Sequence, residues 1–174
     1  FVGKMVIREL LDHPSYELAG VIVHSPGKEG ADVGELVGRE PIGLRATIDV
    51  RATLAAEADA VAYFGPTAQY AAQNIENLSR ALAAGKNVVD TSMTPLVYPK
   101  ACPPQMVAPL DEACRKGGPS CFTTGSDPGF ANDRFPMTVR GVGGRGDRVR
   151  SQELLDYSAY PGAYEPMGGG APGE

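Results

Sequence analysis

The sequence has no hydrophobic run that approaches the roughly 20 apolar residues of a membrane span, and no leader with a basic start and a small-residue cleavage site. We therefore expect a cytoplasmic protein without a membrane partner. Its three cysteines are odd in number and lack C-x-x-C spacing, which disfavours a disulfide framework and a metal site. Lysine and arginine are dispersed and the formal net charge is -5, so no basic stripe indicates a nucleic-acid partner.

Helix-like and strand-like segments alternate along the chain, and hydrophobic residues make up 43% of it. This pattern predicts an α/β fold with a Rossmann-type, doubly wound parallel sheet covered by helices. The predicted strands are 18–23, 43–47, 60–64, 87–91, 120–123 and 148–155. The predicted helices are 5–11, 31–37, 49–57, one ending at Gly85, 105–116 and one from Asp127 to about Arg140.

The first residues match the second half of a dinucleotide-binding βαβ unit. Val2 and Gly3 lead into a helix, and an apolar strand with a polar end follows. Gly3 takes the place of the last glycine of G-x-G-x-x-G, where the helix packs closely on the first strand. That strand and the first two glycines are not in the sequence, so we expect an N-terminally truncated Rossmann domain over 1–146. Residues 147–174 are expected to begin a second, α+β domain for substrate binding and oligomerisation.

The predicted strand 18–23, the second strand of the βαβ unit, is followed by His24, Ser25 and Lys28, with no acidic residue at that point. Enzymes that select NAD usually place Asp or Glu there to bind the ribose 2′-hydroxyl. A hydroxyl, an imidazole and an ammonium suit a 2′-phosphate instead. The pattern predicts NADP as the cofactor, with NAD as a further possibility. The other interpretation is an ordinary polar turn.

Two more turns follow predicted parallel strands, at the end where open α/β sheets bind ligands. The first contains Gly65, Pro66 and Thr67, and the second contains Thr91 and Ser92. Small and hydroxyl residues let the backbone approach a nicotinamide ribose. We predict that these residues contact the cofactor; any one of them alone is equally consistent with an ordinary strand-to-helix turn.

The dipeptide Asp127-Pro128 is a favourable helix start, because Asp caps free N–H groups and Pro fits the first helical position. We predict that Gly125, Pro128 and Gly129 lie at the cofactor. Asp127 and Asp133 are candidates for a catalytic acid or base, although capping is the favoured role for Asp127.

Six segments carry a resemblance to a known family. They are Val2-Gly3, Glu17-Leu18-Ala19-Gly20-Val21, His24-Ser25-Pro26-Gly27-Lys28, Gly34-Glu35-Leu36, Gly85-Lys86-Asn87-Val88-Val89 and Thr124-Gly125-Ser126-Asp127-Pro128-Gly129-Phe130. The chain resembles the dihydrodipicolinate-reductase-like oxidoreductases, and most closely the branch that includes 2,4-diaminopentanoate dehydrogenase. The His-His and Lys pattern of the lysine-pathway reductases is absent, which favours the amine-dehydrogenase branch.

The resemblance implies an NAD(P)-dependent dehydrogenase that transfers hydride at a carbon–nitrogen centre of an amino acid, diamine or cyclic imine. It also implies a small amine or imine substrate and a homo-oligomer. The alternatives are a dihydrodipicolinate reductase of lysine biosynthesis and a nucleotide-binding module or fragment without catalysis.

Overall fold

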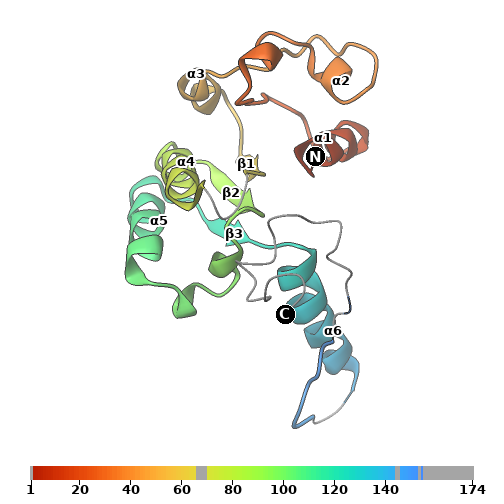
Figure 1. Cartoon of the computed structure of the whole chain (residues 1–174), viewed down its shortest axis with the longest axis vertical. Coiled ribbons are helices and arrows are strands. Elements are labelled where there is room, and N and C mark those ends of the chain that lie inside the picture. Colours follow the sequence, from red (N-terminus) through yellow and green to blue (C-terminus); the bar gives the residue numbers. More distant parts are fainter. Residues whose placement is uncertain (1, 66–69, 144–145, 153, 155–174) are drawn as a thin grey trace, which may run out of the picture. The chain divides into compact units, whose positions relative to one another are not determined.

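The computed structural model describes residues 2–65, 70–143, 146–152 and 154, and these residues form an α/β arrangement (Figure 1). The helices are α1 (Val2–Asp12), α2 (Val33–Leu36), α3 (Val50–Ala55), α4 (Ala71–Ala83), α5 (Pro104–Gly117) and α6 (Phe135–Val142). The strands are β1 (Ala60–Tyr63), β2 (Asn87–Asp90) and β3 (Cys121–Thr123). The short 3-10 segments are η1 (Pro26–Lys28), η3 (Thr94–Val97) and η4 (Pro99–Ala101), and η5 (Ser126–Arg134) is an irregular helical segment before α6. The chain divides into two compact units, Phe1–Thr123 and Thr124–Glu174.

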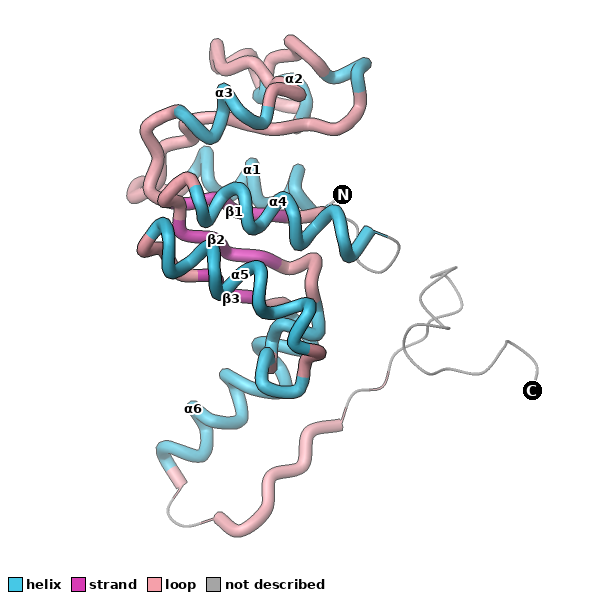
Figure 2. Tube along the Cα trace, turned by 90° about the vertical axis from the view of Figure 1, so that its left-hand side faces the viewer, coloured by secondary structure: helices cyan, strands magenta, loops and turns pink. Residues whose placement is uncertain are grey.

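The centre of the first unit is a three-stranded parallel sheet in the order β1-β2-β3. Parallel neighbours need a crossover connection, and α4 and α5 provide the two crossovers on one face of the sheet (Figure 2). On the helix-covered face Val88 and Asp90 are buried, whereas Val89 on the other face is 40% exposed. The alternation along β2 follows from the two-residue period of a strand. The α/β class and a Rossmann-like parallel sheet are therefore confirmed.

The core lies between the sheet and the two crossover helices. Leu78 and Leu82 of α4 are buried there, with Val88 of β2 and Leu110 of α5. Leu78 and Leu82 share one face of α4, and Ile75 packs against the same cluster, as positions i, i+3 and i+7 of a helix do. Deleting such a buried leucine side chain typically costs about 2–5 kcal/mol.

Local signals set the ends of several elements as expected. The carboxylate of Asp49 accepts a hydrogen bond from the Ala52 amide at 2.9 Å and caps α3. Gly85 has φ of +79° directly after α4, and Gly118 has the same φ after α5. Glycine adopts this left-handed conformation without the steric cost that a Cβ brings.

The strands expected at 18–23 and 43–47 shrink to one parallel bridge between Ile22 and Thr47. Two backbone hydrogen bonds flank it, from Val23 N to Thr47 O and from Thr47 N to Val21 O. The ladder does not extend from Thr47 back toward Gly43, because Arg45 forms an antiparallel bridge with Asp32 instead. It does not extend beyond Thr47, because Asp49 caps α3. Among the described residues, β1 pairs with a strand on its β2 edge alone.

The connection from α2 to the Thr47 bridge is organised by Asp32. Its carboxylate accepts hydrogen bonds from the amides of Gly34, Ile42 and Gly43 at 2.8, 3.0 and 2.8 Å. The backbone hydrogen bond from Ile42, followed by those from Gly43 and Gly34, holds the pKa of Asp32 below its usual 3.8.

We expect this loop to lose stability in acid. A folded pKa below the unfolded value means that the ionised carboxylate stabilises the fold fully above the unfolded pKa. That stabilisation is lost as the pH falls through the lower, folded pKa. Protection factors of the Ile42 and Gly43 amides in hydrogen exchange should therefore fall below about pH 4. In Asp32→Asn these amides should be poorly protected at every pH; unchanged protection of the wild type in acid would contradict the assignment.

In the second unit the strand expected over 148–155 is absent from residues 148–152, which form no regular element. Most of 147–174 lies outside the described residues, so the second domain and its boundary stay predictions. No helix among the described residues combines the length and the apolar character needed to cross a membrane.

Candidate functional site

The three parallel strands end in one row. Tyr63 of β1 is in register with Asp90 of β2, and Asp90 is in register with Thr123 of β3. Because parallel strands share a carboxyl edge, the turns that follow β1 and β2 begin side by side, as the sequence indicates. Pro66 and Thr67, predicted cofactor contacts, lie outside the described residues.

Gly65 occupies a position where a side chain does not fit. A Cβ built there would lie 2.7 Å from Asn74 Oδ1 and 2.8 Å from Tyr63 Oη. The glycine is therefore required by the tight packing of α4 against the end of β1.

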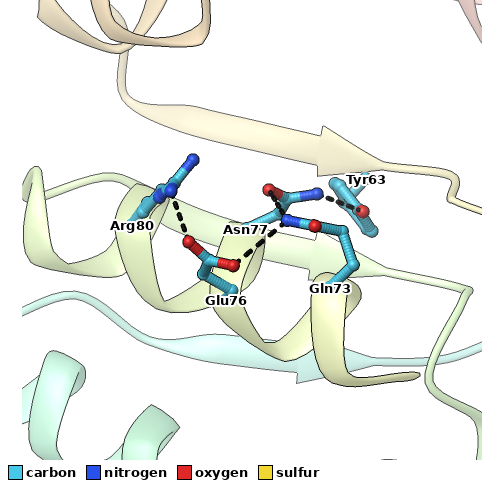
Figure 3. A network of polar contacts seen from close by, with 5 residues as sticks. All are labelled: Tyr63, Gln73, Glu76, Asn77 and Arg80. Atoms are coloured by element: carbon cyan, nitrogen blue, oxygen red, sulfur yellow. Dashed lines mark hydrogen bonds and ion pairs between the residues drawn. The ribbon is translucent and has the colours of Figure 1, made fainter. Parts of the chain in front are cut away.

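The residues that crowd Gly65 belong to a polar network. Tyr63 Oη donates to Asn74 Oδ1 at 2.8 Å. It accepts from Asn77 Nδ2 at 3.0 Å, and Figure 3 shows this part of the network. Gln73 Nε2 extends the network to Asn77 and to Glu76, which pairs with Arg80. Burial raises the pKa of Tyr63; the Asn77 hydrogen bond opposes this and the Asp90 charge adds to it. The phenol therefore stays protonated and serves as a donor at neutral pH.

The turn after β2 is fixed by the buried carboxylate of Asp90. Ser92 is 1% exposed and its hydroxyl donates to Asp90 Oδ1 at 2.6 Å. The Ser92 hydroxyl is thus bonded inside the protein. The expected contact of Ser92 with a cofactor stays a prediction, and it would involve the backbone of the turn. Thr91 is half-buried, and its hydroxyl forms no hydrogen bond with another described residue.

His24, Ser25 and Lys28 are exposed around the short helix η1. The turn is closed by a backbone hydrogen bond from Lys28 N to Ser25 O at 2.9 Å. Within the described part of the chain, the imidazole of His24 and the ammonium of Lys28 have no side-chain partner. The imidazole and the ammonium are therefore both available to a ligand.

Sequence reasoning missed the role of Glu29, the acid that follows this turn. Its carboxylate accepts hydrogen bonds from Thr47 Oγ1, at 3.0 Å, and from the amide of Ile48. Glu29 is therefore occupied in joining the two bridged segments. The signal is a tertiary one, because Thr47 lies 18 residues further along the chain.

Val2 and Gly3 lie in the first turn of α1, where Val2 is 49% exposed. A Cβ at Gly3 would meet Phe64 Cβ at 3.9 Å, an ordinary contact distance. Among the described residues nothing else is packed against this position, so the expected close approach of a first strand stays a prediction.

The helix expected from Asp127 begins later, which corrects the predicted cap. Asp127, Pro128 and Gly129 have non-helical backbone angles inside η5, and Pro128 has φ of -71° and ψ of 158°. The carboxylate of Asp127 accepts from the side-chain amide of Asn132 and from no helix N–H of the described residues. The N-cap residue of a helix is followed directly by the first helical residue. Because Pro128 is extended, Asp127 cannot cap the first turn of the helix.

The loop before the helix is closed by Asp133 and Gly129. Asp133 Oδ2 accepts from the Gly129 amide at 3.1 Å. Gly129 is buried with φ of +131°, and a Cβ there would lie 2.8 Å from Thr124 Oγ1. A Cβ at Gly125 would lie 3.0 Å from Pro128 O. The glycines serve the loop itself, and contacts of Gly125, Pro128 and Gly129 with a cofactor stay predictions.

The cysteines of unit one are free thiols. Burial, with contributions from the charges of Asp90 and Cys114, raises the pKa of Cys121 to about 11, and burial also raises the pKa of Cys114. Such thiols are poor nucleophiles at neutral pH, because the thiolate is the reactive form. In the described residues, no group of three or more His, Cys, Asp or Glu side chains is placed to hold a metal ion.

Comparison with known proteins adds two relatives, and no family model matches the chain. The chain is 36% identical over 181 residues to an amine dehydrogenase of Streptomyces virginiae, a match that covers 95% of this chain and 50% of that protein. The solved structure of the amine dehydrogenase from Mycobacterium smegmatis superposes with a TM-score of 0.69 at 25% identity, over 79% of this chain and 40% of that one. The chain thus spans about half the length of the curated relative. The structural match supports a Rossmann-like α/β fold for this chain.

Proposed function

We propose that this chain is part of an NAD(P)-dependent dehydrogenase that acts on the carbon–nitrogen bond of a small amine. The observation that carries the proposal is the 36% identity, along 95% of the chain, to a protein named amine dehydrogenase. The parallel sheet supports it, because turns with small and hydroxyl residues follow β1 and β2 at the ligand-binding edge. The finer assignment, to relatives of 2,4-diaminopentanoate dehydrogenase, rests on the resemblance of the Ser25–Lys28 and Thr124–Phe130 segments.

The described residues fit a dinucleotide. Gly65 allows backbone at the sheet edge where a Cβ would collide with Tyr63 and Asn74. Lys28 and Ser25 offer an ammonium and a hydroxyl beside the end of the Val21–Val23 segment. The carboxylate that follows them, Glu29, is engaged by Thr47 and Ile48. This arrangement favours a 2′-phosphate over a 2′-hydroxyl, because cations bind the phosphate and no free acid repels it.

The contribution of the chain to catalysis is binding and orientation. A nicotinamide cofactor supplies the hydride chemistry when bound. The Thr91 hydroxyl, free of described partners, is the polar side chain of the β2 turn that can orient a ligand. Asp90 holds the β2 turn in place through buried hydrogen bonds from the amides of Ser92 and Met93. Tyr63 joins the end of β1 to Asn74 of α4. Asp127 and Asp133 remain candidates for the general acid or base of the second unit.

The test of the proposed function is amine-dependent reduction of NADP by the full-length protein, followed by nicotinamide absorbance. We expect turnover with short primary amines, diamines or 2,4-diaminopentanoate, and none without an amine. If the protein binds NADP but reduces it with none of these amines, the interpretation as a nucleotide-binding module without catalysis is favoured. Oxidation of NADPH by dihydrodipicolinate, without reduction of NADP by amines, would favour the lysine-pathway alternative.

Lys28→Ala should weaken NADP binding by about 5- to 30-fold, the 1–2 kcal/mol scale of one charged hydrogen bond. NAD binding should change little, because NAD lacks the phosphate that Lys28 is expected to bind. Titration calorimetry with both cofactors measures the ratio. Lys116→Ala is the matched control, since this exposed lysine lies at the end of α5, beside the start of β3. Equal losses for both cofactors would remove the 2′-phosphate assignment.

A further inference from the structure

We propose that Asp90 is a positioning residue: its carboxylate locks the turn Thr91–Met93 at the carboxyl edge of the sheet and so sets how deeply the nicotinamide end of a cofactor binds. The proposal rests on the proposed function for its readout. Asp90 itself touches no ligand in this scheme, because its side chain is fully buried, at 0% exposure.

Four donors surround the two oxygens of this carboxylate. Oδ1 accepts from the Ser92 amide at 2.7 Å and from the Ser92 hydroxyl at 2.6 Å. Oδ2 accepts from the Met93 amide and from Thr123 Oγ1, each at 3.1 Å. An ionised carboxylate is an acceptor alone and has about four lone-pair sites. The site therefore matches that acceptor in both number and type of donor.

The charge of Asp90 has no counter-ion in the described part of the chain, where no ion pair includes it. A buried charge is costly unless hydrogen bonds compensate it. Two of the four compensating donors are backbone amides of the same turn. If the turn moved, the carboxylate would lose these donors, so the buried charge makes displacement of the turn expensive.

The same bonds determine what the turn can offer to a ligand. Thr91 N donates to Tyr63 O at 3.2 Å, and the amides of Ser92 and Met93 donate to Asp90. All three N–H groups of the turn are thus used inside the protein. The hydroxyl oxygen and the carbonyl oxygen of Thr91 remain. Both are acceptors, and acceptors suit a ligand group that carries N–H.

Asp90→Asn tests the proposal because no orientation of an amide reproduces the carboxylate. If its NH2 replaces Oδ1, it faces the Ser92 amide; if it replaces Oδ2, it faces the Met93 amide. Either way one backbone anchor of the turn meets a donor instead of an acceptor. Thr123→Val is the matched control, since it removes one hydroxyl bond to Asp90 and leaves both backbone anchors.

In the full-length protein, well below the unfolding temperatures of both variants, Asp90→Asn should raise the Kd and KM for NADPH by about tenfold, the scale of one hydrogen bond to a charge. It should also lower kcat, because the ring is misplaced. Thr123→Val should destabilise the protein while its cofactor constants stay within about twofold. Equal cofactor constants in the two variants would overturn the proposal and leave Asp90 a purely structural residue.

Hydrogen exchange of the wild type gives a second measurement that does not depend on a folded variant. A turn locked by Asp90 should show slow exchange of the Ser92 and Met93 amides before any cofactor is added. Fast exchange that slows on addition of NADPH would overturn the proposal. If the wild type binds NADPH but does not oxidise amines, the proposed function is refuted. The dissociation constants of Asp90→Asn and Thr123→Val for NADPH would still decide the role of Asp90.

Discussion

Gly129→Ala is expected to destabilise the second unit by about 1–3 kcal/mol, the range for a residue forced into a sparsely populated backbone region. Gly129 has φ of +131°, which L-residues with a Cβ rarely adopt. A Cβ would also lie 2.8 Å from Thr124 Oγ1 and 3.2 Å from the Thr124 carbonyl carbon. Because the second contact is with backbone, a rotation of the threonine side chain cannot relieve it.

The matched control for this substitution is Gly141→Ala, in the same unit. Gly141 lies in α6, and a Cβ there would have nothing within 4 Å. Alanine is favoured over glycine in a helix by up to about 1 kcal/mol, so this variant should be neutral or stabilising. Urea denaturation of both full-length variants, with exchange of the Gly129 and Phe130 amides as a local probe, makes the comparison. Equal stability of the two would mean that the positive φ at Gly129 is not required.

Gly65→Ala is expected to cost about 1–3 kcal/mol, the penalty for disrupting a buried polar pair, and to weaken cofactor binding. The new Cβ would lie 2.7 Å from Asn74 Oδ1 and 2.8 Å from Tyr63 Oη and Cε1. These side chains must separate to admit it, although they are joined by a 2.8 Å hydrogen bond. Asn74 is 1% exposed, so water cannot easily replace the weakened bond.

Thermal unfolding and NADPH titration of full-length Gly65→Ala measure the two effects. Gly27→Ala is the control for stability, since Gly27 is exposed and a Cβ there would have nothing within 4 Å. It should change stability by less than about 0.5 kcal/mol, as for most surface positions. Equal stability of Gly65→Ala and Gly27→Ala would mean that the close approach of Tyr63 and Asn74 does not require a glycine at position 65.

The sequence alone determined the elements whose signals are local. The strands β1, β2 and β3 are predicted because short apolar runs stop at turn residues, and each lies where the sequence indicates. The ends of α4 and α5 follow from glycines at 85 and 118, where the chain turns with positive φ. In each case the residues that decide the structure lie within a few positions of one another.

Tertiary structure decided the features whose partners lie far apart in the chain. Asp90 and Thr123 are 33 positions apart, and nothing in the Val89-Asp90-Thr91 sequence shows that four donors meet at the carboxylate. Asp127-Pro128 reads as a helix start, yet Gly129 and Thr124 pack into a loop that delays the helix. The segment 43–47 reads as a strand, but a ladder needs a continuous neighbour. The segment forms two isolated bridges instead, a parallel one from Thr47 to Ile22 and an antiparallel one from Arg45 to Asp32. Secondary-structure propensity depends on residues that are close in the sequence. Hydrogen-bond partners, in contrast, are determined by which groups folding buries next to one another.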